Sequence, residues 1–289
     1  MASIKEIKEN LETVSRIKNI ASTYQDIANL RMNQIRENVL KNREFFNELL
    51  DTYQKVRSAY FLPLTEKKKK KEKTVFREAK KEKIVLFLST DQLFYGTLII
   101  DIWKQVQKYL EQNKANLAVV GKTGKRLAEN SGLGHKMFYF QLNDVKPEKE
   151  KLAGILDFIK NYKKIIVFHG KYEKVLSQKP AISEISGELP WQEEKMKTKP
   201  KIIESYIFEP SAEKILDFFE KEIIAVLFNQ TILEHQLARY ASRVIAMHQA
   251  NENAKKEQKK LLKSEFKLRN QKQNKKQVEF FNSIYGAIY

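Results

Sequence analysis

The stretch from Ser211 to Ile284 contains neither glycine nor proline, so no residue in it breaks a helix by its backbone geometry. Apolar residues recur along it at spacings of three and four, or seven where a polar residue interrupts. This apolar seam consists of Ile223, Val226, Leu233, Leu237, Tyr240, Val244, Met247, Ala254, Leu261 and Leu268. A period sustained this far predicts a coiled coil, with a helix of about 75 residues on the order of 110 Å long.

Residues 1–62 repeat this pattern, because they also lack glycine and proline and carry a second apolar seam. The members of the second seam are Ile4, Ile7, Leu11, Val14, Ala21, Ala28, Met32, Ile35, Val39, Phe46, Leu49, Tyr53, Val56 and Tyr60. Pro63 predicts the end of the helix, since proline lacks the backbone donor. Two helices of matching period can bury their seams against each other, which predicts an antiparallel pair.

Turn-forming residues are confined to the middle of the chain. All six prolines and eight of the nine glycines lie between Pro63 and Pro210. The predicted organisation is therefore a coiled-coil helix over 1–62, a basic linker over 63–83, an α/β domain over 84–208 and a second coiled-coil helix over 209–289. The linker contains the run Lys67–Lys73, which is typical of a solvated segment.

The middle segment alternates short apolar runs with amphipathic stretches, which indicates a small α/β domain with a mainly parallel sheet. Strands are expected at Ile84–Leu88, Leu117–Val120, Met137–Phe140, Ile165–Phe168 and Ile202–Phe208. Helices are expected at about Leu98–Leu110, Lys125–Asn130 and Lys149–Tyr162. The segment Ser177–Lys199 is expected to form an exposed loop or an irregular hairpin.

Few residues suggest a catalytic, nucleotide-binding or metal-binding role. Gly121–Lys125 resembles a phosphate loop, but Asn116 stands where that loop needs a glycine, so a strand-to-helix turn is favoured. Asp91 follows the first strand without an accompanying base or nucleophile, which favours a cap or turn. The four histidines, His135, His169, His235 and His248, lack metal-ligand spacing and are expected on the surface or facing a partner. No catalytic residue, cofactor or metal is predicted.

The net charge of +18 favours acidic partners, which include nucleic acid, an anionic membrane surface and acidic protein segments. The basic stretch Lys255–Lys276 lacks the interleaved aromatics of a nucleic-acid reader, apart from Phe266. No signal peptide or long apolar span is present, and there is no cysteine, so an intracellular protein is expected. A basic coiled-coil protein that binds nucleic acid or acts as a scaffold remains the alternative function.

Several motifs are specific to one family. Ser242–Ala254 is similar to the pattern A-R-M-x-A-M-x-x-A-T-x-N-A of the γ subunit of F-type ATP synthases, and Leu11–Met32 resembles the N-terminal helix of that family. In the middle, Thr90–Gly96 resembles S-D-R-G-L-C-G, and Val120–Gly124 resembles I-G-K-K-G. Lys272 and Gln273 stand where the family has R-Q. The resemblance spans nearly the whole chain in the same order.

The resemblance implies a Rossmann-like α/β domain flanked by the two coiled-coil helices. It also implies a non-catalytic rotor that sits inside a ring of three α and three β subunits and sets the conformations of the catalytic β subunits. An ε-like subunit or another partner at the α/β domain is implied, with no nucleic acid, and with cytoplasmic location at the membrane only through the complex. Departures such as Lys272 imply either a divergent proton-coupled synthase or a paralogous F1-like ATPase linked to surface motility.

The same resemblance identifies residues expected to contact the ring. Some lie in the N-terminal helix, some in the motif after Ser242, and the rest towards the C-terminus. They are Arg31, Met32, Arg243, Met247, Lys272, Gln273, Glu279, Phe280 and Ile284.

Overall fold

The computed structural model describes residues 3–61, 81–174, 177–185, 209 and 211–286. The chain forms two compact units, one drawn from Met1–Leu30 and Arg243–Tyr289 and the other from Arg31–Ser242. The Lys67–Lys73 run and the predicted strand Ile202–Phe208 lie outside the described residues. No described helix has a stretch long and apolar enough to cross a membrane.

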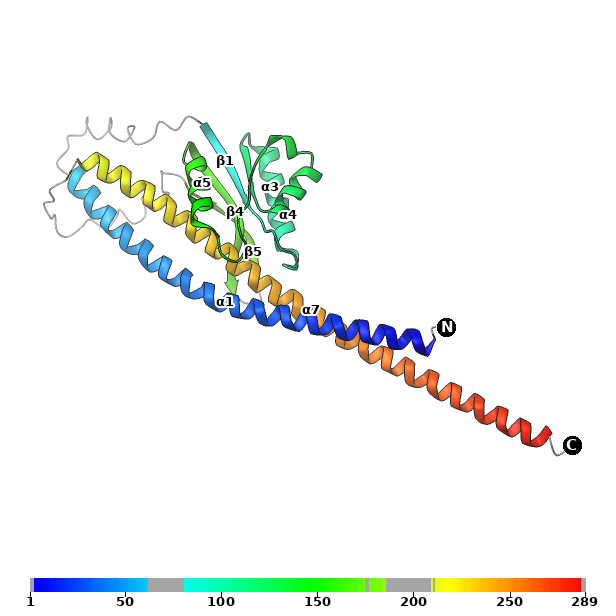
Figure 1. The fold of residues 1–289 in the computed structure, drawn as a ribbon. Helices are drawn as coiled ribbons and strands as arrows, with labels where there is room; N and C mark the ends of the chain where they lie inside the picture. The colour runs from blue at the N-terminus through cyan, green and yellow to red at the C-terminus, as the bar shows by residue number, and fades with distance from the viewer. Residues whose placement is uncertain (1–2, 62–80, 175–176, 186–208, 210, 287–289) are drawn as a thin grey trace. The chain divides into compact units, whose positions relative to one another are not determined.

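Two long helices match the glycine-free and proline-free ends of the sequence (Figure 1). Helix α1 spans Ile4–Phe61 and helix α7 spans Ala212–Gly286. Helix α1 begins with a capping box, in which the Glu6 amide donates to Ser3 Oγ (3.2 Å) and the Ser3 amide donates to Glu6 Oε2 (2.7 Å). Both predicted helices are therefore confirmed, and α1 ends two residues before Pro63.

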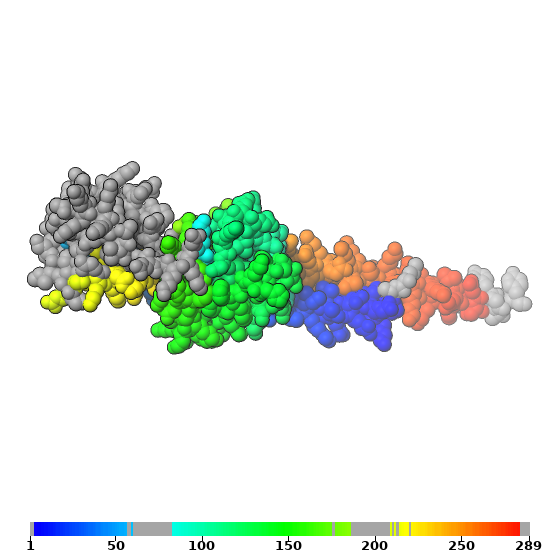
Figure 2. Space-filling view, turned by 90° about the horizontal axis from the view of Figure 1, so that it is seen from above, coloured from blue at the N-terminus to red at the C-terminus, as the bar shows by residue number. Residues whose placement is uncertain are grey.

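In the unit of Met1–Leu30 and Arg243–Tyr289, α1 and α7 lie side by side, blue and orange in Figures 1 and 2. Several predicted seam residues are buried in this unit: Ile7, Ala21, Ala28, Met247 and Ala254. The Arg243 guanidinium lies over the Tyr24 ring, 5.9 Å from its centroid.

In the unit of Arg31–Ser242, the later part of α1 packs on the earlier part of α7. Leu50, Tyr53, Leu216 and Ile223 form a buried apolar cluster between them. A polar layer, in which Asn42 bonds both Asn229 and Gln230, lies earlier in α1 and later in α7 than this cluster. Higher numbers in α1 pair with lower numbers in α7, so the helices are antiparallel, as the sequence predicts.

A five-stranded sheet has the order β3-β2-β1-β4-β5. The strands are β1 (Lys81–Leu88), β2 (Asn116–Val120), β3 (Met137–Phe140), β4 (Tyr162–Lys174) and β5 (Ser177–Glu184). The first four are parallel, and β5 is antiparallel to β4. The mainly parallel sheet is confirmed, and β1 begins at Lys81, earlier than the predicted Ile84. The expectation of an exposed loop or irregular hairpin at Ser177–Lys199 is wrong for Ser177–Glu184, which forms the edge strand β5 because its backbone pairs with β4; residues 186–199 lie outside the described residues.

Helices cover both faces of the sheet (Figure 1). They are α3 (Leu98–Gln112), α4 (Lys122–Asn130) and α5 (Lys149–Ile159), with a 3₁₀ turn, η1, at Gly134–Lys136. Residues of α3 and α4 pack on the face that carries Val85 and Phe87, while α5 packs on the face that carries Ile84 and Leu86. The helix predicted up to Tyr162 ends at Ile159, because Tyr162 already begins the buried strand β4.

Candidate functional site

Helix α7 crosses the carboxyl edge of the sheet. Phe228 and Ile232 belong to the core on the α5 face, whereas Ala238 belongs to the core on the α3 face. Around Ala238, every residue from His235 to Ala241 is buried. A helix buried on all sides must pair its polar groups within the protein. This crossing contains four buried polar residues, Thr231, His235, Gln236 and Arg239, which we call the docking face of α7.

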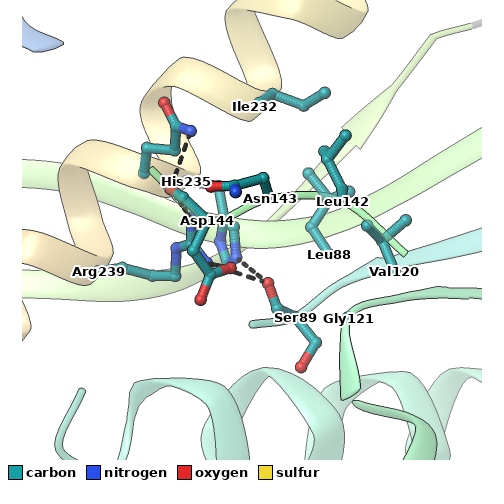
Figure 3. Close-up of a pocket in the computed structure, with 11 residues that line it drawn as sticks. Leu88, Ser89, Val120, Gly121, Leu142, Asn143, Asp144, Ile232, His235 and Arg239 are labelled. Atoms are coloured by element: carbon teal, nitrogen blue, oxygen red, sulfur yellow. Dashed lines mark hydrogen bonds and ion pairs between the residues drawn. The ribbon is translucent and has the colours of Figure 1, made fainter. Parts of the chain in front are cut away.

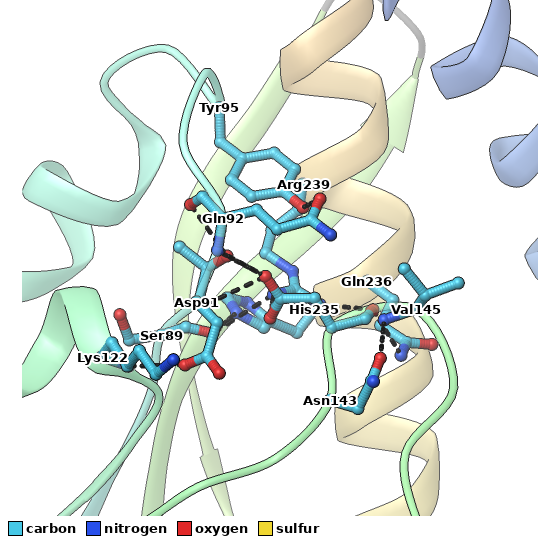
Figure 4. A network of polar contacts seen from close by, with 12 residues as sticks. Ser89, Asp91, Gln92, Tyr95, Lys122, Asn143, Val145, His235, Gln236 and Arg239 are labelled. Carbon is cyan, nitrogen blue, oxygen red and sulfur yellow. Dashed lines mark hydrogen bonds and ion pairs between the residues drawn. The ribbon is translucent and has the colours of Figure 1, made fainter.

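Asp144, in the loop after β3, is the centre of the polar contacts. Figure 4 shows the network to which Asp91, Gln92 and Arg239 belong. Its Oδ2 accepts hydrogen bonds from the amides of Asp91 (2.9 Å) and Gln92 (2.8 Å) and from Thr90 Oγ1 (2.5 Å). Its Oδ1 accepts one from Arg239 Nη1 (2.5 Å). One buried carboxylate therefore joins the loop after β1, the loop after β3 and helix α7.

Arg239 and Asp144 form a buried ion pair, with side-chain exposures of 4% and 5%. Arg239 Nη2 also donates to the Asp144 carbonyl (3.3 Å), and its guanidinium lies 5.4 Å from the Tyr95 ring centroid. Burial alone would lower the pKa of Arg239, but the charges of Asp144 and Tyr95 outweigh it, so the pKa is raised. The arginine therefore stays charged in the interior.

His235 bridges β1 and β4. Its Nδ1 accepts from the Gly170 amide (2.9 Å), which leaves Nε2 to donate to the Ser89 carbonyl (3.2 Å). Burial, followed by the charges of Arg239 and His169, lowers its pKa well below the usual value, so the ring is neutral. Gly170 makes this approach possible, because a Cβ there would lie 3.0 Å from Leu98 Cδ2 and 3.1 Å from Ala238 Cβ.

The arrangement fills the place where doubly wound sheets bind ligands. The strand order reverses between β1 and β4, and ligands of such folds bind at the carboxyl ends of the strands at this point. Here His235 occupies it, and the remaining cavity beside Ser89 and Arg239 is only about 20 Å³ (Figure 3). That volume is far below the several hundred Å³ of a ligand pocket. The carboxyl edge of this sheet is thus a docking site for a helix.

The candidate phosphate loop has the predicted structural role. Gly121, with φ of 96°, ends β2 and precedes α4, and a Cβ there would lie 2.8 Å from the Thr90 amide nitrogen. Asp91 Oδ1 accepts from the Lys122 amide (2.7 Å) at the first residue of α4. The interpretations of this segment as a strand-to-helix turn and of Asp91 as a cap are both confirmed.

The prediction for the histidines is wrong for two of the four. His135 and His248 are exposed, but His169 and His235 are 1% and 3% exposed and bonded inside the protein. Within the part of the chain that the structure describes, no three His, Cys, Asp or Glu side chains gather as a metal site requires.

The nine predicted ring-contact residues differ in their exposure. Arg31 is exposed and Met32 half-buried on α1, whereas Arg243 and Met247 are buried on α7. Further along α7, Lys272, Gln273, Glu279 and Phe280 are exposed, and the Ile284 side chain lies outside the described residues. Their contacts with a ring stay a prediction.

Sequence reasoning missed the docking face. A periodicity argument follows the apolar seam and treats polar residues off that seam as solvated. The signal available was the dense set of polar residues with hydrogen-bonding side chains between Thr231 and Ser242, a segment with few lysines and glutamates. No spacing rule could have paired Arg239 with Asp144, 95 residues earlier.

Comparisons with known proteins point to one family. A family model described as ATP synthase matches residues 3–278. The ATP synthase gamma chain of Actinobacillus pleuropneumoniae serotype 5b (strain L20) is 25% identical over 269 residues, with 88% of each chain covered. That of Chloroflexus aurantiacus (strain ATCC 29366 / DSM 635 / J-10-fl) is 22% identical over 271 residues, again with 88% of each chain covered.

A solved structure shares the fold. A chain in the Euglena gracilis mitochondrial ATP synthase structure titled OSCP/F1/c-ring, rotational state 3, has a TM-score of 0.66 and 17% identity, with 98% of this chain and 94% of that chain covered. The likeness includes the long helices as well as the sheet, and the nucleic-acid-binding alternative is not favoured. With the family model matching nearly its whole length and gamma chains as its relatives, the chain belongs to the ATP synthase family as a gamma chain.

Proposed function

We propose that this chain is the central-stalk rotor of an F1-type ATPase, where it transmits torque and sets the conformations of the catalytic β subunits. In this proposal it makes no chemical step itself. Family membership supports the rotor role, and the filled carboxyl edge of the sheet supports a non-catalytic one. The chain is one component of an ATP synthase complex.

The observation that carries the proposal is the C-terminal part of α7. Every described side chain from residue 271 to 283 is exposed, and these include Val278, Phe280 and Phe281, each more than half exposed. In Figure 2 the side chains of this end of the helix, coloured red, are visible at the surface. A helix that exposes aromatic side chains along its length is suited to a partner that surrounds it.

The partners follow from this role. One copy would stand within three α and three β subunits, with an ε-like subunit or another protein at the α/β domain. The basic faces between Lys255 and Lys276 would meet acidic segments of the ring through screened contacts, which favour free rotation over tight binding. Attachment to the cytoplasmic side of a membrane would come only through the complex, in a proton-coupled synthase or in a motility-linked motor.

Affinity purification of the chain from its own cells, followed by mass spectrometry, tests this proposal. Two nucleotide-binding subunits in excess over this chain, with ATP hydrolysis by the isolated complex, are the expected result. The remaining companions separate the two kinds of motor, because a synthase brings proton-channel subunits with it. Recovery of nucleic acid and no ATPase subunits would refute the proposal.

The purified chain alone should neither bind nor hydrolyse ATP. Calorimetric titration with Mg²⁺ and ATP measures this directly. Stoichiometric binding would show that the chain holds a nucleotide site of its own, and the non-catalytic assignment would then fail.

A further inference from the structure

We propose that the buried Asp144–Arg239 pair is the joint through which rotation of helix α7 is carried to the α/β domain, with Arg239 as the positioning residue. The inference rests on the proposed rotor function. In this inference, particular side chains hold the sheet at a fixed angle about the axis of α7. The rotor role alone does not identify which side chains do so.

Two kinds of contact join α7 to the sheet. The apolar contacts of Phe228, Ile232 and Ala238 bury surface on both faces. Apolar attraction depends on buried area and has no preferred direction, so it resists separation more than it resists a turn of the helix. Hydrogen bonds and ion pairs depend on both distance and angle, so they resist rotation.

The polar contacts all come from one side of α7 and end on backbone or on Asp144. Gln236 Nε2 and Arg239 Nη2 both donate to the Asp144 carbonyl (3.2 and 3.3 Å). His235 reaches the Ser89 carbonyl and the Gly170 amide. One turn further along the helix, Ser242 Oγ donates to the Tyr95 carbonyl (2.7 Å). The contacts thus reach the ends of β1 and β3, the middle of β4 and the loop before α3.

Of these contacts, the ion pair resists rotation of α7 most strongly. Turning α7 about its axis would separate Arg239 from Asp144 while both remained in the interior, and an unpaired buried charge is far more costly than a lost neutral hydrogen bond. Asp144 is in turn fixed by the amides of Asp91 and Gln92, so the restraint passes into the loop after β1. The joint is therefore stiff on both sides.

The chain contains no cysteine, so a single introduced cysteine gives a unique attachment point. Lys108→Cys places it on the exposed side of α3, away from the docking face. The whole complex is immobilised through its ring, a rod is attached to this cysteine, and two quantities are measured together: the angular variance of the rod during pauses and the rate of ATP hydrolysis.

In this assay Arg239→Met should at least double the angular variance while the complex hydrolyses ATP at the unchanged rate, because the joint softens and the ring does not. Arg239→Lys, which keeps the charge without the fork of donors, should give an intermediate variance. Lys221→Met is the matched control, since Lys221 pairs with Asp217 on the exposed side of α7. It should leave both quantities as they are.

An unchanged variance in Arg239→Met would overturn the proposal. If that variant does not enter the ring, Arg239→Lys decides by the same comparison with Lys221→Met. A substitution could lower ATP hydrolysis only in proportion to the loss of assembled complex and leave the angular variance unchanged. That result would assign the pair a purely structural role and overturn the proposal. Absence of ATP-driven rotation in the chain that carries only Lys108→Cys would refute the rotor function itself.

Discussion

Helix α7 contains two segments that share one period and have opposite surroundings. From Thr231 to Ser242 it is buried on nearly every side, and His235, Arg239 and Ser242 form hydrogen bonds to the sheet and its loops. From residue 271 to 283 each described side chain is exposed, with three lysines in the first half of the segment and two adjacent phenylalanines towards its end. The same helical repeat thus supports a fixed attachment in one segment and an exposed surface in the other.

The difference teaches that periodicity alone does not say what a helix is for. In the buried segment, stability depends on each polar group having its partner, since an unpaired one is costly in the interior. In the exposed segment, a side chain can be removed with little loss of stability, because water already surrounds it. Stability measurements should therefore separate the two segments clearly.

The largest effect is expected at the centre of the docking face. Arg239→Ala leaves the Asp144 carboxylate buried without its counter-ion, which should lower the free energy of unfolding by about 3–5 kcal/mol. Urea denaturation of the full chain measures this change. Lys255→Ala is the control, because Lys255 pairs with Glu252 on the exposed surface and should cost about 0–1 kcal/mol. Equal effects from the two variants would remove the distinction between the docking face and exposed positions of α7.

The second effect concerns acid. Burial lowers the pKa of both His235 and His169, so the unfolded chain binds protons at these residues before the folded chain does. Stability should then fall as the pH drops below about 6.5, by up to about 1.4 kcal/mol for each histidine in the first pH unit. Above about pH 7.5 neither histidine is appreciably protonated in either state, so no further change is expected from them.

Urea denaturation at pH 7.5 and 5.5 tests this linkage. His235→Gln should reduce the pH dependence, whereas His248→Gln, at an exposed position, should leave it unchanged. A chain as stable in acid as at neutral pH, or an equal effect of the two substitutions, would contradict the assignment of neutral buried imidazoles.

A third effect compares two glycines. Gly170→Ala brings a Cβ within 3.0–3.1 Å of Leu98 and Ala238, and overpacking of this kind should cost about 1–3 kcal/mol. Gly154 lies inside α5 with open space around it, so Gly154→Ala should instead stabilise the chain by about 0.5–1 kcal/mol. The midpoint of thermal unfolding should move in opposite directions for the two variants. If both variants move the midpoint in the same direction, the close approach of α7 to β4 is not what requires a glycine at position 170.

Much of the fold followed from local sequence. The long helices were predictable because residues 1–62 and Ser211–Ile284 lack glycine and proline, and four strands were predictable because short apolar runs such as Ile84–Leu88 are flanked by turns. Strand β5 was not, since Ser177–Glu184 mixes charged and polar residues and contains Pro180. It is an edge strand held by its pairing with β4, and edge strands tolerate proline and charge.

The docking face could not be predicted from local sequence, for a different reason. Arg239, Gln236 and His235 have the composition of a solvated helix surface, and their burial arises only when loops from distant parts of the chain close over them. Asp144 lies in a loop with no periodicity of its own. Long-range pairing of this kind depends on the sheet order, which brings the loops after β1 and β3 and the middle of β4 near one another. Local propensity does not specify that order.

The smallest effect on stability, and the sharpest test of the exposed segment, is expected at Phe280 and Phe281. They are 63% and 59% exposed, so Phe280→Ala and Phe281→Ala should change the free energy of unfolding of the isolated chain by no more than about 0.5 kcal/mol. In the complex, the same substitutions remove apolar contacts from the surface that we propose lies inside the ring. They should reduce the amount of this chain retained by immobilised ring subunits, whereas Asn270→Ala, at another exposed position of α7, should not. Retention that is unchanged by both phenylalanine substitutions would mean that the exposed segment is not the surface the ring surrounds, and the contrast between the two parts of α7 would then need another explanation.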